Sequence, residues 1–198
     1  MTAEIIAYMA FEQDMERRME FSLVMQCAPF LKGMRAASIL NMERPWARGL
    51  YRLFEATDIS WRILAVRKER CLVLFYRETE LEKVLADREV RRFLKGYGYE
   101  GLELSQSITQ LSVRMGLYVK GKMDFPHEMG VFLDYPLEDV KAFIENGGRK
   151  SVLTGCWKVY CNVERAGLTF LAYDKAKDSA VNEFLAGKRI SEIAKTGT

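Results

Sequence analysis

Two β-rich runs joined by a charged connection constrain the fold of this chain most strongly. Residues 61–66 and 71–76 are rich in β-branched and aromatic side chains, and residues 67–70 between them are all charged. This pattern predicts an antiparallel hairpin. The second run is apolar at four consecutive positions, 72–75, so both of its faces need to be covered. We therefore expect that strand to be central in a sheet and to lie between helices.

Most of the remaining chain shows the three- and four-residue spacing of apolar side chains that is typical of helices. The predicted helices cover residues 3–26, 29–40, 45–56, 79–94, 102–119, 137–146, 163–184 and 190–194. Pro29 is expected to end the first helix and to open the second, because proline disfavours helical geometry in the residue before it. Gly147 and Gly148 are expected to end the helix over 137–146 in the left-handed conformation.

Two further short runs, 129–133 and 156–161, are predicted to be strands of the same sheet as the hairpin. The expected fold class is α+β, with a small, mostly antiparallel sheet covered by helices. A chain of 198 residues can bury a core as one domain over 1–198, and the alternative is two small lobes.

Charge and hydropathy exclude several classes of protein. Thirty basic and 27 acidic residues give a formal net charge of +3 with an even spread, so no nucleic-acid partner is expected. The basic cluster within 88–95 is predicted to be a solvated helix face. No apolar stretch reaches membrane-spanning length and no signal peptide is recognisable, so the predicted location is the cytoplasm, with four reduced cysteines. Oligomeric state is not predicted.

The only histidine, His127, is the main candidate for proton transfer or metal ligation, and Glu128 is a second candidate metal ligand. Neighbours in an extended segment point to opposite faces, so the two side chains are not expected to act on one atom unless the backbone turns. The alternative for His127 is a buried imidazole that hydrogen-bonds to the backbone and serves only the fold.

An aromatic pocket is predicted beside this histidine. Tyr135 and Pro136 turn the chain after the first predicted strand, and the glycine pair brings it back, so the strand over 156–161 can lie alongside. The predicted ligand-binding residues are His127, Tyr135, Trp157, Lys158 and Tyr160. For Trp157 the alternative is core packing.

Thiol chemistry is a separate hypothesis. Cys27 precedes His127 and Asp139 in the order found in papain-like enzymes, and these three residues are the candidate catalytic set. A cysteine at a helix N-terminus can have a lowered thiol pKa. The alternatives are a buried, inert Cys27 at a helix junction and a helix-capping role for Asp139. A zinc finger is excluded, because no closely spaced cysteine pair accompanies the single histidine.

The segments FPHEMGVFLDYPLEDVKAFIENGG at 125–148 and GCWKVY at 155–160 resemble the hallmark of an uncharacterised bacterial family. It is the domain of unknown function numbered thirty-seven ninety-three, found mainly in anaerobes. Residues 27–29, 74–76 and 98–99 are also similar to its pattern, so the resemblance extends over nearly the whole chain. Asp134 departs from it, since the pattern implies a glycine there. The resemblance implies membership, and a link to iron or redox metabolism, without a defined activity.

Three functions from different classes therefore stand as hypotheses. The favoured one is an accessory protein that binds a small molecule or metal, in iron or redox metabolism of anaerobic bacteria, because no catalytic motif is complete. The alternatives are a Cys-His thiol-dependent hydrolase or transferase and a non-catalytic protein-interaction module. The sequence predicts no specific cofactor and does not decide whether the protein is an enzyme.

Overall fold

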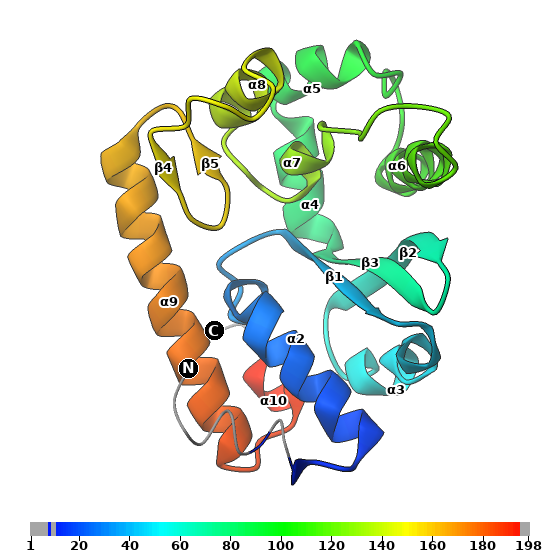
Figure 1. Ribbon diagram of the computed structural model, residues 1–198, viewed down its shortest axis with the longest axis vertical. Helices are drawn as coiled ribbons and strands as arrows, with labels where there is room; N and C mark the ends of the chain where they lie inside the picture. The colour runs from blue at the N-terminus through cyan, green and yellow to red at the C-terminus, as the bar shows by residue number, and fades with distance from the viewer. Residues whose placement is uncertain (1–7, 9–10, 195–198) are drawn as a thin grey trace.

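A three-stranded antiparallel sheet lies at the middle of the protein in the computed structural model, which describes residues 8 and 11–194 (Figure 1). Its strands are β1 (Ala37–Glu43), β2 (Ile59–Arg67) and β3 (Arg70–Arg77), in the order β1-β3-β2. The predicted hairpin is confirmed as β2 and β3, and β3 is central, as its two apolar faces require.

Alternate side chains of β3 enter two different hydrophobic cores, one on each face of the sheet. Cys71, Val73 and Phe75 belong to the first core, and Leu74 belongs to the second, with Leu72 packed against it. Helices cover both faces, which confirms the α+β class (Figure 1). Because one strand contributes to both cores, we propose that the chain folds as a single domain.

The first core is covered by α2 (Met15–Leu31), α3 (Leu50–Phe54), α10 (Ile190–Ile193) and the C-terminal part of α9 (Val163–Leu185). The second is covered by α4 (Glu78–Ala86), α5 (Arg88–Lys95), α6 (Leu104–Val119), α7 (Met129–Phe132) and α8 (Leu137–Glu145). The N-terminal part of α9 runs beside a small separate sheet of β4 (Leu153–Thr154) and β5 (Lys158–Val159) (Figure 1). None of the helices in the described ranges is long and apolar enough to cross a membrane.

The predicted helix over 29–40 is wrong. Pro29 lies within α2, which continues to Leu31, and the chain then forms edge strand β1. Residues of β1 alternate between the two faces and pair along the whole of β3, so sheet pairing outweighs the weak local helical pattern. As a result, Cys27 lies in the C-terminal half of a helix and not at a helix N-terminus.

The strand predicted over 129–133 is also wrong, because residues 129–132 form the short helix α7. A short buried apolar run does not distinguish a strand from a helical turn. Of residues 156–161 only Lys158 and Val159 form a strand, and they pair with β4 rather than with the main sheet. Asp134 ends the α7 segment at φ 58°, the left-handed region that favours glycine.

Several predicted helices are confirmed with small changes of boundary, namely α6, α8, α9 and α10. Gly147 and Gly148 have the expected positive φ values of 57° and 71°. The predicted helix over 79–94 is divided into α4 and α5 at Asp87, whose carboxylate accepts hydrogen bonds from the first amides of α5. The predicted helix over 45–56 is a 3-10 turn, η1 (Arg44–Arg48), followed by α3. Of the predicted helix over 3–26, residues 15–26 are confirmed as part of α2, residues 12–14 are not helical, and residues 3–7 and 9–10 lie outside the described residues.

Candidate ligand-binding cavity

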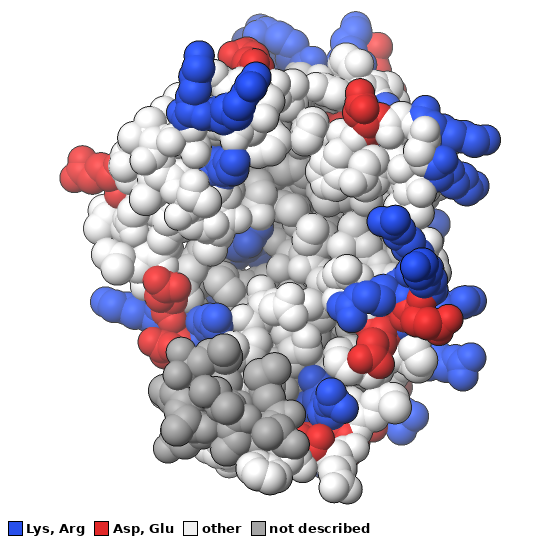
Figure 2. All heavy atoms as spheres, viewed as in Figure 1, with Lys and Arg blue, Asp and Glu red and all other residues white. Residues whose placement is uncertain are grey.

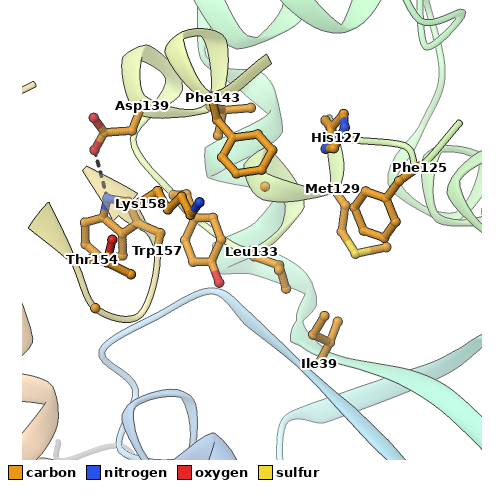
Figure 3. A pocket seen from close by; sticks show the side chains of 14 residues that line it. Ile39, Phe125, His127, Met129, Leu133, Asp139, Phe143, Thr154, Trp157 and Lys158 are labelled. Atoms are coloured by element: carbon orange, nitrogen blue, oxygen red, sulfur yellow. Dashed lines mark hydrogen bonds between the residues drawn. The ribbon is translucent and has the colours of Figure 1, made fainter. Parts of the chain in front are cut away.

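A cavity of about 310 Å³ lies between the second face of the sheet, helices α7 and α8, and the β4–β5 hairpin (Figure 3). Figure 2 shows this face of the molecule hollowed between the hairpin and α7, with Lys or Arg side chains within the hollow. Aromatic and aliphatic side chains make most of the wall. The lining residues are Ile39, Phe125, His127, Met129, Gly130, Leu133, Tyr135, Asp139, Val140, Phe143, Thr154, Gly155, Trp157 and Lys158.

His127 lies in the turn that leads from Pro126 into α7, and its side chain is half-buried. The imidazole packs between two aromatic rings, with centroid distances of 5.3 Å to Phe125 and 5.2 Å to Phe143 (Figure 3). No group within residues 8 and 11–194 forms a hydrogen bond with its ring nitrogens. The imidazole is therefore held by packing, and its polar atoms remain able to bind a ligand.

Glu128 is separated from this cavity although it is the next residue. Its side chain is fully buried, accepts a hydrogen bond from the Tyr99 hydroxyl at 3.2 Å and forms an ion pair with Arg114 on α6. Burial and the nearby Glu128 carboxylate raise the pKa of Tyr99. The structure therefore does not bring Glu128 and His127 to one site, and the Glu128 ion pair joins the α7 segment to α6.

Asp139 fixes the wall of the cavity. Its carboxylate, on α8, is buried and accepts a hydrogen bond from the Trp157 indole at 2.8 Å (Figure 3). It also accepts hydrogen bonds from the backbone amides of Tyr160 at 2.8 Å and Cys161 at 2.9 Å. These bonds connect α8 to the β4–β5 hairpin, so the carboxylate does not cap its own helix. The Trp157 ring also lies 5.5 Å from the Tyr135 ring, which gives the cavity a rigid aromatic wall.

Lys158 contributes a cation to the same wall. Its ammonium donates a hydrogen bond of 2.5 Å to the carbonyl of Gly148 and lies 5.9 Å from the centroid of the Phe143 ring. Tyr160 does not line the cavity, because β5 ends at Val159 and the strand alternation that would place Tyr160 beside Lys158 stops there. Its hydroxyl is buried and has no hydrogen-bond partner within the described ranges.

One comparison with known proteins identifies the family. The model of the family described as "Protein of unknown function (DUF3793)" matches residues 23–194. The chain belongs to this family. All the lining residues of the cavity fall within the matched span of the DUF3793 domain. A search of curated proteins and a search of solved structures each gave no match.

The structure of this DUF3793 protein does not assemble the candidate thiol triad. Cys27 is 1% exposed and packs in the first core, whereas His127 and Asp139 line the cavity at the second face. Burial raises the pKa of the Cys27 thiol to about 11, which is opposite to the lowering expected at a helix N-terminus. Cys27 therefore lacks both the location and the ionisation of a nucleophile.

The hypothesis that His127 and Glu128 bind a metal ion finds no preformed ligand cluster in the part of the chain that the structure describes. No group of three or more His, Cys, Asp or Glu side chains there could hold a metal ion. The cavity instead combines aromatic rings with one imidazole and one ammonium group.

Nine lining residues were not predicted in any site role, and they are Ile39, Phe125, Met129, Gly130, Leu133, Val140, Phe143, Thr154 and Gly155. Phe125 and Phe143 both lie inside the 125–148 segment. Phe125, two residues before His127, could have been predicted to lie near the imidazole. Ile39 had no local signal, since it reaches the cavity only because β1 pairs with β3.

Proposed function

We propose that this DUF3793 protein is a bacterial accessory protein that binds a small molecule in the cavity beside His127. The observation that carries the proposal is an imidazole packed between Phe125 and Phe143, without a hydrogen bond to other described residues, facing a cavity of about 310 Å³. Natural small-molecule pockets begin at about 300 Å³ and are mainly apolar with a few placed polar groups. This cavity fits the small end of that class.

Preorganisation supports binding. The three hydrogen bonds to Asp139 hold Trp157 and the hairpin in place before any ligand arrives. A wall that is already ordered loses little entropy on binding, so more of the contact energy appears as affinity.

Binding is favoured over catalysis because of how the polar groups are used. Asp139 is the one carboxylate among the lining residues of the described chain, and three N–H donors already occupy it. The buried Cys27 provides no nucleophile. The four cysteines are free, the state expected in a reducing compartment, and on that ground we propose a cytoplasmic location. A role in iron or redox metabolism rests on the family resemblance alone.

A fragment screen by ligand-observed NMR, followed by calorimetry, tests the proposal. Thr154→Trp is designed to obstruct the cavity from the exposed β4 strand, and Val152→Trp adds the same side chain at an exposed position nearby that does not line it. Fragments that bind the wild type and Val152→Trp should lose affinity for Thr154→Trp. The absence of hits, or equal affinity for both variants, would count against the proposal.

A further inference from the structure

We infer that the ligand is a small aromatic acid, whose anionic group lies at the Phe143 end of the cavity, near His127 and Lys158, and whose flat ring fills the aromatic part. This inference rests on the proposed function, since it assigns a chemical class to the ligand of the same cavity.

The polar groups that remain available in the cavity favour an anion. The Lys158 ammonium is the one lining cation within the described ranges, and the His127 ring nitrogens have no partner there. The Asp139 carboxylate keeps its charge, but its oxygens are directed to the hairpin, to the Trp157 indole and the amides of Tyr160 and Cys161. The Lys158 ammonium has three hydrogens and uses one of them for the Gly148 carbonyl. Two donors remain for a bound carboxylate, and a charge-assisted hydrogen bond in an apolar cavity is stronger than one in water.

The two basic groups converge on one aromatic ring. His127 approaches Phe143 from the turn before α7, with a centroid distance of 5.2 Å, and Lys158 approaches from β5, with its Nζ 5.9 Å from the same centroid. Figure 3 shows Phe143 between these two side chains. An acid group beside the positive edge of the Phe143 ring therefore has polar partners available from two elements that are separated in the sequence.

The rest of the wall suits a flat apolar body. The Trp157 ring, which lies against Tyr135, forms one side. Phe125 and Met129 form another side, across the cavity from Trp157 (Figure 3). Aromatic rings stack favourably on such surfaces, and a thioether makes favourable contacts with a ring edge. Aromatic walls also attract cations in some proteins, but here the Lys158 ammonium in the wall opposes a cationic ligand.

Three probes with the same ring and different charge test the inference on the full chain: 2-naphthoate, 2-naphthamide and 2-naphthylmethylamine, measured by calorimetry. We expect the acid to bind about tenfold more tightly than the neutral amide, with the amine weakest. Lys158→Met should weaken the acid about tenfold and leave the amide within about twofold, whereas Lys158→Arg, which keeps the charge, should retain acid binding.

Two further variants complete the design. His127→Phe keeps a ring between Phe125 and Phe143 but removes the two ring nitrogens, so it should weaken the acid more than the amide. Lys175→Met, on the exposed face of α9 and outside the cavity, removes the same charge as Lys158→Met and should leave all three affinities unchanged.

The outcomes separate the two proposals. Equal binding of acid and amide, or tighter binding of the amine, overturns the inference and leaves the small-molecule cavity standing. If none of the three probes binds, a predominance of neutral or cationic compounds among the fragment hits overturns the inference. If the fragment screen also gives no hits, the proposed function is overturned with it.

Discussion

Asp139→Ala should loosen the attachment of the β4–β5 hairpin to α8. The substitution leaves three donors without their acceptor: the Trp157 indole and the amides of Tyr160 and Cys161. Cys161 is exposed, so water can replace the carboxylate there. Leaving a buried donor unpaired costs about 1–3 kcal/mol. The other two donors are part-buried, so the lower end of that range applies to each, and the destabilisation is about 2 kcal/mol, which corresponds to a fall in melting temperature of about 4–8 °C for a chain of this size.

Thermal unfolding by circular dichroism measures this difference, and Glu138→Ala is the matched control. Glu138 is exposed on the same first turn of α8, so its substitution should change stability by no more than about 0.5 kcal/mol. Asp139→Asn keeps an oxygen for the two backbone amides but not a second acceptor for the indole, and should lie between the two. The Trp157 indole N–H should also exchange faster with solvent in Asp139→Ala. Equal melting temperatures for Asp139→Ala and Glu138→Ala would refute the role assigned to this carboxylate.

Three other predictions concern close packing, pH and thiol reactivity. A Cβ at Gly155 would lie 2.4 Å from the Phe170 ring, so Gly155→Ala should lower the free energy of unfolding, measured in urea, by about 1–3 kcal/mol. Gly167 in α9 has open space around it, so Gly167→Ala should raise the free energy of unfolding by about 0.5–1 kcal/mol. The opposite order of stabilities would contradict the packing at Gly155. The hydrogen bond from Lys32 is the main cause that lowers the pKa of Glu183 to about 2. Glu183→Gln should therefore lower the free energy of unfolding by about 1 kcal/mol at pH 7, by less as the pH falls below about 4.5, and by almost nothing near pH 2. A full difference between the wild type and the variant at pH 2, in urea unfolding, would contradict this. Ellman's reagent should titrate two thiols in the native protein and four after denaturation, because two cysteines are exposed and two are buried; rapid native labelling of all four would contradict it.

The fold could be predicted from the sequence where one local signal determined the answer. The apolar run of β3 on both faces predicted a central strand between helices, and the structure has it. Pro29 misled the prediction because burial of the last turn of α2 in the first core, where Phe30 and Leu31 pack, outweighs the cost of a proline within the helix. The failure at 129–133 has a different cause, since neither length nor apolar content distinguishes a buried helical turn from a short strand there.

The candidate site was predictable where its residues lie close together in the sequence. His127, Tyr135, Trp157 and Lys158 lie in or near one continuous segment, and the structure places all four around one cavity. Tyr160 was assigned to the wall by strand alternation, which a two-residue strand does not sustain. The contribution of Ile39 depended on the pairing of β1 with β3 over a long sequence separation, which no local pattern reveals.

The central claim is that a small molecule binds beside His127, and the most direct test is an NMR titration of protein labelled with ¹³C at the methionine methyl groups. Met129 lines the cavity, whereas Met19 and Met42 lie in the core on the other face of the sheet. The Met129 resonance, assigned with Met129→Leu, should shift saturably on addition of 2-naphthoate, with the affinity found by calorimetry, while Met19 and Met42 stay unchanged. Calorimetric binding without a shift at Met129, or equal shifts at all three methionines, would contradict the account.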